Sequence, residues 1–304
     1  MGWLDFFIRD KPKLNHNKFY CIRKDSFFLD ASKHKHFLKY GWCKIENVVT
    51  QSEIDDFMDT FNDISKMDGF ELDKNLLNSG RLFNPEIRKI TQAAINRNAQ
   101  TILPRMFDMS KTDSHTGGAF QVKPSHPESD LLIHQDSSVI DEENDYCLFV
   151  WIPFCDVTEN NGIISFVNGS HLWGNIHRSL GVPWQFLSKV KTLYNYTTPV
   201  KLSKGDVLVF DPATIHASAP NLSGKIRHAI TMTVLRKDYQ LVYYYRNKDI
   251  ADNLVEKYYV DENFYYEYDF VSKPDETKWK KEVIPFIDFE MPENQLEKLI
   301  HKYK

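Results

Sequence analysis

Two histidines and one aspartate of this chain have the residue types of a metal-ligand set. His134 and Asp136 stand two residues apart, and His216 follows much later in the sequence. Two imidazoles and one carboxylate bind mononuclear non-haem iron(II) on one face of an octahedron and leave three coordination positions open. Because those positions accept a cosubstrate and dioxygen, this set predicts oxygen activation.

A cation follows the second histidine. Residues 220–224 read as a turn, and Arg227 then opens a stretch whose alternate residues share one face of a strand. If that face points inward, the guanidinium needs an anion, because an unpaired buried charge is costly. Asp211 is the only nearby carboxylate, and its place before a proline predicts a turn. We therefore expect a bound 2-oxoacid carboxylate to pair with Arg227, the alternative being a surface salt bridge on an edge strand.

The candidate ligands lie among short predicted strands. From about residue 115 the chain shows short runs rich in Val, Ile, Phe, Tyr and Thr, broken by Gly, Pro and Asn, as is typical of a β-sandwich or barrel. Residues two apart on a strand point to the same face, so His134 and Asp136 can both face inward. The expected strands are 118–123, 131–135, 146–152, 163–167, 199–202, 206–210 and 228–235, with one more at 241–245.

Helices before these strands are expected to support the sheet. A capping box over residues 50–53 predicts the start of one helix, and Asn84-Pro85 predicts the start of another. A further strand is expected at 42–49, after a lead-in with weak structure signals. We expect a single domain over residues 1–304. Its parts are a lead-in with buttress helices (1–110), a core (115–245) and a C-terminal extension (246–304) that ends in a short amphipathic helix.

Composition points to a globular protein with small-molecule chemistry. Hydrophobic residues make up 42% and charged residues 26%, as in ordinary globular domains. The net charge is −4 without a long basic block, so no nucleic-acid partner is expected. No run of about 18 apolar residues exists, so no membrane span is expected, and residues 1–10 are too acidic for a signal peptide. Four cysteines without metal-type spacing suit a reducing cytosol, which predicts a cytoplasmic location.

Taken together, the motifs resemble those of the phytanoyl-CoA dioxygenase family of iron(II)- and 2-oxoglutarate-dependent oxygenases. The resemblance covers about residues 40–236 and implies a mainly β, cupin-like fold with flanking helices, the double-stranded β-helix or jelly-roll. Asn168 stands where the family usually has proline, which alters a turn and leaves the metal ligands unchanged. The matching pieces are His134-Gln-Asp136, Trp151-Ile-Pro153, Asn161-Gly162, Gly169-Ser-His171, Gly205-Asp206, His216-Ala-Ser218 and Arg227.

The resemblance also implies roles for individual residues. The implied iron ligands are His134, Asp136 and His216. The implied cosubstrate residues are Arg227 and Ser218 at the 5-carboxylate of 2-oxoglutarate, with Trp151 and Gln121 beside it. The candidate substrate-binding residues are Lys123, His177 and Trp173, and no catalytic residue is expected beyond the metal ligands. An aromatic insert between residues 174 and 200 is expected to shape the pocket and is a candidate lid.

The implied reaction hydroxylates an unactivated C–H bond and converts 2-oxoglutarate and O2 to succinate and CO2. Asp136 favours hydroxylation, or desaturation or ring chemistry from the same oxidant, over halogenation, because related halogenases carry Gly or Ala at that position. We expect a small metabolite as substrate, and an acyl-CoA substrate is the alternative within the family. Two further alternatives are a metal- or small-ligand-binding jelly-roll without catalysis, against which Arg227 and Ser218 argue, and a zinc hydrolase, which would need a nearby general base.

Overall fold

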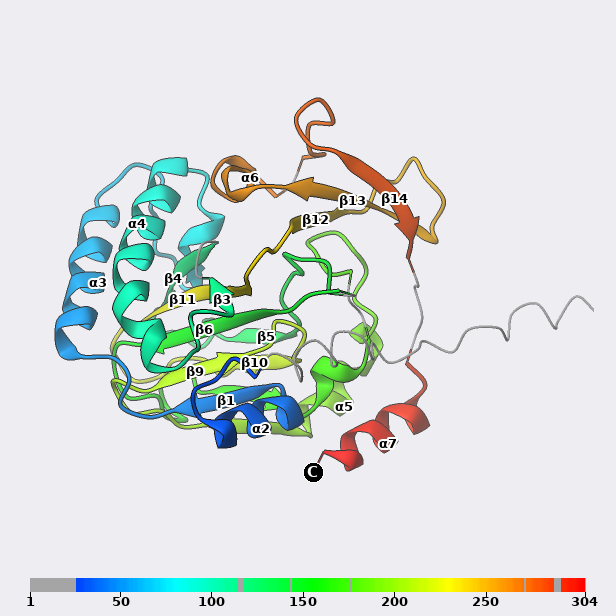
Figure 1. Cartoon of the computed structure of the whole chain (residues 1–304). Helices are drawn as coiled ribbons and strands as arrows, with labels where there is room; N and C mark the ends of the chain where they lie inside the picture. The colour runs from blue at the N-terminus through cyan, green and yellow to red at the C-terminus, as the bar shows by residue number, and fades with distance from the viewer. Residues whose placement is uncertain are drawn as a thin grey trace, which may run out of the picture.

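A seven-stranded, antiparallel sheet forms the larger layer of the molecule (Figure 1). The computed structural model describes residues 26–113, 117–142, 144–174, 177–270, 272–286 and 291–303. The expectation about a signal peptide concerns residues 1–10, which lie outside the described residues. In spatial order the strands are β1 (Trp42–Ile45), β9 (Val207–Phe210), β6 (Cys147–Pro153), β11 (Arg227–Arg236), β4 (Gly118–Lys123) and β2 (Leu77–Asn78), with β3 (Thr112–Asp113) paired to β11.

A four-stranded sheet forms the second layer of the jelly-roll. Its order is β5 (Leu131–His134), β10 (His216–Ser218), β7 (Ile164–Val167) and β8 (Thr197–Val200), all antiparallel. The predicted fold class, a mainly β jelly-roll with flanking helices, is confirmed. Each strand expected between residues 118 and 235 has an observed counterpart within a few residues, whereas the short strands β2, β3 and β10 were not expected.

Two helices buttress the larger sheet, as expected. Helix α3 (Gln51–Ile64) begins with the predicted capping box, in which Thr50 and Glu53 satisfy each other's backbone N–H groups. Helix α4 (Pro85–Ile102) begins after Asn84, whose side chain accepts a hydrogen bond from the backbone of Glu86 at 3.0 Å. Their apolar faces pack with strands β4, β6 and β11 in one hydrophobic core, and Figure 1 shows them side by side.

The end of the lead-in is more ordered than its sequence indicated. Residues 31–40 form helix α2 (Ala31–Tyr40), capped by Asp30, which accepts a hydrogen bond from Ser32 N at 2.7 Å. The helix ends at Gly41, whose φ of +83° is a left-handed conformation that glycine adopts without strain. A Cβ at Gly41 would also lie 2.4 Å from Oγ1 of Thr214, which stands two residues before His216. The close packing of these two segments therefore requires a glycine at position 41.

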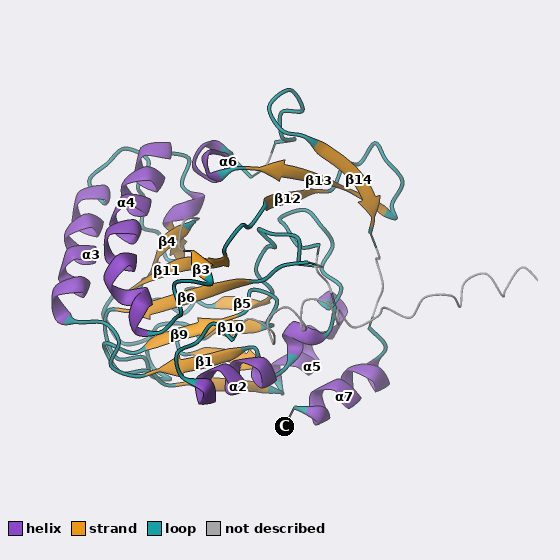
Figure 2. Ribbon diagram, viewed as in Figure 1, coloured by secondary structure: helices purple, strands orange, loops and turns teal. Residues whose placement is uncertain are grey.

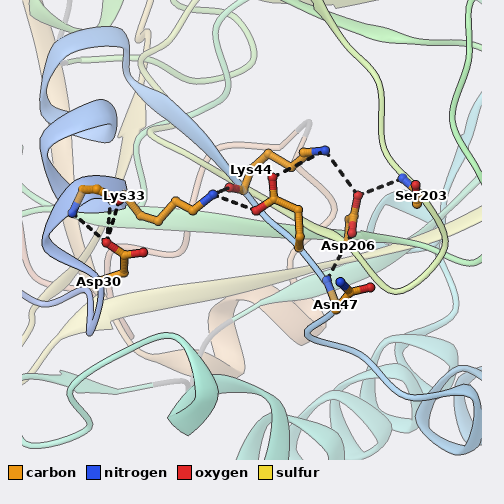
Figure 3. A network of polar contacts seen from close by, with 8 residues as sticks. Asp30, Lys33, Lys44, Asn47, Ser203 and Asp206 are labelled. Carbon is orange, nitrogen blue, oxygen red and sulfur yellow. Dashed lines mark hydrogen bonds and ion pairs between the residues drawn. The ribbon is translucent and has the colours of Figure 1, made fainter.

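Polar contacts join α2 and β1 to the turn before β9 (Figure 3). Lys33 Nζ donates to the carbonyl of Lys44 at 2.8 Å and pairs with Glu46 at 2.7 Å. Asp206 accepts hydrogen bonds from Asn47 N at 3.1 Å and Ser203 N at 2.8 Å. The Gly205-Asp206 motif therefore stabilises the turn that leads into β9 and takes no direct part in the metal group.

The chain beyond Arg236 builds a separate, three-stranded sheet. It contains β12 (Leu241–Tyr245), β13 (Leu254–Val260) and β14 (Lys281–Pro285), accompanied by α6 (Glu262–Glu267), and Figure 2 shows it apart from the jelly-roll strands. The strand expected at 241–245 exists, but it pairs with β13 and not with the jelly-roll. The jelly-roll thus differs from the expected core of 115–245 at both ends, because it includes β1 and β2 and ends at Arg236.

The second layer is covered on its outer side by the insert and the C-terminal helix. Helix α7 (Glu293–Lys302), which was expected, packs Leu296 and Ile300 into a hydrophobic cluster with Ile133 and Ile215. The insert contributes α5 (Val190–Tyr194) to the same side of the molecule (Figure 2). The remaining short 3-10 helices are η1 (Ser79–Arg81), η2 (Leu103–Arg105), η3 (Ser170–Leu172) and η4 (Leu187–Lys189).

Two observations bear on the expected cellular context. Among the described residues, none of the helices has the length and apolar character needed to cross a bilayer. Among the described cysteines, Cys43 and Cys155 are free thiols. The cytoplasmic location and the single-domain organisation stay predictions.

Candidate metal centre

Strand pairing places the two candidate histidine ligands side by side. His134 ends β5, His216 begins β10, and the two are direct partners in the antiparallel register. Their ring centroids lie 4.3 Å apart. Asp136 follows β5, and its two carboxylate oxygens each lie 3.5 Å from the Nε2 atom of one histidine. One donor atom from each residue falls within 4.8 Å of the others, so the structure brings all three predicted ligands together.

Backbone carbonyls orient both imidazoles for metal binding. Nδ1 of His134 lies 2.7 Å from the carbonyl oxygen of Leu132, and Nδ1 of His216 lies 2.9 Å from that of Thr214. This geometry assigns the ring proton to Nδ1 in each case and leaves the lone pair on Nε2, which is directed towards Asp136. Two such nitrogens and a carboxylate form a donor set that fits a ferrous ion.

Protonation also favours metal binding. Burial, with a smaller contribution from the neighbouring His134, lowers the pKa of His216 to about 4, although Asp136 acts in the opposite direction. Burial raises the pKa of Asp136, but the charges of His216 and His134 outweigh it, so that this pKa falls to about 2. At neutral pH, His216 is therefore neutral and Asp136 is ionised, which are the forms that a metal ion binds.

The loop that carries Asp136 is held by a residue from the insert. Arg178 Nε donates to the backbone carbonyl of Asp136 at 2.7 Å, and its two terminal nitrogens pair with Glu142 at 2.9 and 2.7 Å. Both side chains of this pair are buried. The preceding residue, Gln135, accepts a hydrogen bond from Trp184 Nε1 at 3.0 Å. The insert thus positions a ligand loop, a role that its composition did not indicate.

Arg227 has the surroundings of an anion-binding residue. It begins β11 and is 2% exposed, with its Nη1 donating to the carbonyl of Gly162 and its Cζ 5.1 Å from the Trp151 ring centroid. Its Nε has no hydrogen-bond partner, and no carboxylate of the described residues pairs with it. Asp211 instead caps a turn, accepting a hydrogen bond from Ala213 N at 2.8 Å, as its place before a proline predicted. Burial lowers the pKa of Arg227 to about 10, so it stays charged at neutral pH.

A second cation lies directly behind this arginine. Lys123 is the register partner of Arg227 on β4, is fully buried, and donates to Ser218 Oγ and to the Ala219 carbonyl at 2.7 Å each. Burial, together with the charge of Arg227, lowers the pKa of Lys123 to about 7. Gly162 permits this packing, because a Cβ there would lie 2.6 Å from Lys123 Cδ at a φ of +90°.

One cavity of about 270 Å³ joins the metal group to Arg227. Its wall includes all three candidate ligands together with Ser218, Trp151 and Gln121, whereas Lys123 lies behind it. The outer wall comes from residues 76–82, which precede α4. Sequence reasoning missed this segment, because its residues match no motif and its contact with β4 is set by the tertiary structure.

The two candidate substrate residues near the insert lie elsewhere. Trp173 is 2% exposed and packs in the hydrophobic cluster behind the second sheet, with its ring centroid 6.0 Å from that of Phe186. His177 packs against Tyr244 at 4.9 Å between centroids. Neither belongs to the cavity wall, and neither does any other described residue of the insert. Their role in substrate binding and the insert's role as a lid stay predictions.

Fold and site together define a jelly-roll protein with a two-histidine, one-carboxylate group at the mouth of its barrel and a buried arginine in the same cavity. A sequence profile described as "Phytanoyl-CoA dioxygenase (PhyH)" matches residues 37–229. This match covers more than half of the chain, so the protein belongs to the PhyH family, as its motifs predicted.

Curated relatives carry the same family name. A "Phytanoyl-CoA dioxygenase domain-containing protein 1 homolog" from Dictyostelium discoideum is 32% identical over 120 residues, which are 36% of this chain and 42% of that protein. A "Phytanoyl-CoA dioxygenase" from Arabidopsis thaliana is 27% identical over 113 residues, 36% of this chain and 40% of its own. The chain thus spans about two fifths of the length of the curated relatives that it matches.

Solved structures share the fold at low sequence identity. The "non-heme alpha ketoglutarate dependent carbocyclase SnoK from nogalamycin biosynthesis" matches with a TM-score of 0.51 at 19% identity, over 76% of this chain and 90% of that one. HygX from Streptomyces hygroscopicus, solved with nickel and 2-oxoglutarate bound, matches with a TM-score of 0.50 at 15% identity, over 69% and 88%. These likenesses establish the double-stranded β-helix fold.

Proposed function

We propose that this protein is an Fe(II)- and 2-oxoglutarate-dependent dioxygenase that hydroxylates a C–H bond of a small molecule. The observation that carries the proposal is a shared cavity, in which a buried arginine with an unpartnered Nε accompanies a convergent His-Asp-His group. A buried guanidinium without a protein anion is costly, so its retention points to a ligand that brings a carboxylate. The PhyH family name and the jelly-roll fold support the same activity.

Each residue of the site has a defined task in this proposal. His134, Asp136 and His216 hold the iron, which when bound couples O2 reduction to the conversion of 2-oxoglutarate into succinate and CO2. Arg227 binds the 5-carboxylate of 2-oxoglutarate as a charge-assisted pair, with Ser218 Oγ beside it. The additional residues Trp151 and Gln121 form the wall along the cosubstrate, and Lys123 positions the Ser218 hydroxyl from behind.

The cavity argues against the other readings. Apart from the three ligand residues, no Asp, Glu or His in the described part of the chain lines it, so zinc hydrolysis lacks a general base. A plain metal-binding jelly-roll has no use for the buried arginine. The volume of about 270 Å³ is at or below the lower end for small-molecule sites, which favours a small substrate over a long acyl-CoA.

Succinate formation tests the proposal. Purified protein with Fe(II), ascorbate and 2-oxoglutarate should release succinate, and Asp136→Ala should abolish this turnover by removing one ligand. Arg227→Ala should weaken 2-oxoglutarate binding by about 2–4 kcal/mol through loss of the charge-assisted pair. His301→Gln, at an exposed position on α7, is the control and should behave as the wild type. Full turnover in Asp136→Ala, or an unchanged 2-oxoglutarate requirement in Arg227→Ala, refutes the assigned roles.

A further inference from the structure

The outer wall of the cavity comes from one short segment with a distinct composition. Residues 76–82 contain β2 and η1, and the cavity side of this segment presents Leu76, Leu77 and Leu82 together with one cation, Arg81. Leu131 on β5 adds another apolar side chain. This part of the cavity is therefore an apolar surface with a single positive charge.

The segment is held in place by the larger sheet. Leu77 and Asn78 of β2 pair with Val122 and Gln121 of β4. Ser79 Oγ, which is fully buried, accepts a hydrogen bond from the backbone N–H of Phe120 at 2.9 Å. These bonds fix the backbone of residues 77–79, directly before Arg81, on the larger sheet.

Arg81 forms no hydrogen bond or ion pair with the described protein, although its charge contributes to lowering the pKa of Asp136. Arg97 and Arg105, in contrast, pair with Asp56 and Glu53 at 2.8 Å. Asp136 is the one carboxylate on the described cavity wall, and in the proposed function it coordinates the metal ion. The cation is thus available to a ligand.

The charge balance of the loaded site leaves Arg81 uncompensated. The two charges of a ferrous ion and the charge of Arg227 offset those of Asp136 and of the two carboxylates of 2-oxoglutarate. Arg81, which is exposed, then adds one positive charge to the cavity wall, where it can pair with an anionic group of a substrate.

We propose that the substrate of this enzyme carries a carboxylate or phosphate group bound by Arg81, and a short apolar part that packs on Leu76, Leu77, Leu82 and Leu131. This inference rests on the proposed function. A cavity of about 270 Å³ that also holds the cosubstrate favours a small substrate. Arg81 acts as the residue that selects anionic substrates over neutral and cationic ones.

Binding to the metal- and cosubstrate-loaded protein tests this inference without turnover. Protein saturated with Ni²⁺ and 2-oxoglutarate is titrated calorimetrically with hexanoate, octanoate, hexyl phosphate and octyl phosphate, and with octan-1-ol and octylamine. Saturating 2-oxoglutarate fills the Arg227 site, so a binding anion must occupy another one. At least one of the anions should bind more tightly than the alcohol and the amine, and the carboxylate and phosphate arms identify the preferred group.

Matched variants locate the binding residue. Arg81→Gln should weaken binding of that anion by roughly tenfold, the value of a charge-assisted hydrogen bond, and leave alcohol binding unchanged. Arg97→Gln removes an arginine outside the cavity wall and should leave all affinities unchanged.

The outcomes separate the two proposals. If wild-type protein fails to bind 2-oxoglutarate with Ni²⁺, the proposed function is wrong. If 2-oxoglutarate binds but none of the anions does, or the alcohol or amine binds equally well, the substrate inference is wrong while the proposed function stands. The substrate inference is also wrong, and the proposed function still stands, if Arg81→Gln binds the anion as tightly as the wild type.

Discussion

Replacing Lys123 with methionine should change how the stability of this protein depends on pH. Lys123 is fully buried beside Arg227 and has a pKa of about 7, against 10.5 for an unperturbed lysine. Between these values the unfolded chain holds the proton and the folded chain has released it. Because the unfolded state then binds more protons, the free energy of unfolding rises with pH from about 7 to about 10.5 and falls as the pH drops towards 7.

The size of the effect follows from the same two pKa values. A single group with this difference raises the free energy of unfolding by up to about 1.4 kcal/mol per pH unit, and by about 2 kcal/mol between pH 7 and pH 9, since the folded state is half-titrated at the start. Lys123→Met keeps most of the side-chain volume and removes the titrating group, so this increment should disappear.

Urea unfolding of both proteins at pH 7, 8 and 9 measures the difference. The wild type should gain about 2 kcal/mol relative to Lys123→Met across this interval. The control is Lys66→Met, which replaces a lysine whose side chain is 74% exposed and should retain the wild-type dependence. A difference between wild type and Lys123→Met that stays constant with pH would show that Lys123 keeps its proton when buried, and the reasoning would fail.

Two further predictions concern residues that support the site. Glu142→Gln should destabilise the protein by about 3–5 kcal/mol in urea unfolding, because it removes the buried carboxylate that pairs with the Arg178 guanidinium. The double variant Glu142→Gln/Arg178→Met should recover part of that loss, and equal stability of the single variant and the wild type would contradict the buried pair. Gly162→Ala should lower the free energy of unfolding by about 1–3 kcal/mol, because the new methyl group would lie 2.6 Å from Lys123 Cδ and the backbone φ is +90°. It should also weaken 2-oxoglutarate binding, and calorimetry with Ni²⁺ that shows wild-type affinity would count against the role of this turn.

Local sequence signals determined the metal group and the elements around it. His134 and Asp136 are two residues apart at the end of a strand, and strand alternation alone directs both side chains the same way. Thr50 and Asn84 start helices through hydrogen bonds to residues two or three positions away. The anion-binding role of Arg227 could be predicted from the sequence, because a charge that faces the interior needs an anion whichever segments surround it.

The tertiary structure alone decided which other residues share the cavity. The pairing of β2 with β4 brings residues 76–82 to the cavity wall, and no short-range pattern encodes that pairing. Core packing buries Trp173 among apolar side chains, and the fold brings Arg178 to the backbone of Asp136, 42 residues earlier in the chain. The physical reason is range: caps and strand alternation act over a few residues, whereas strand register and core packing depend on contacts between distant segments, and a shift of one residue would turn each side chain to the opposite face.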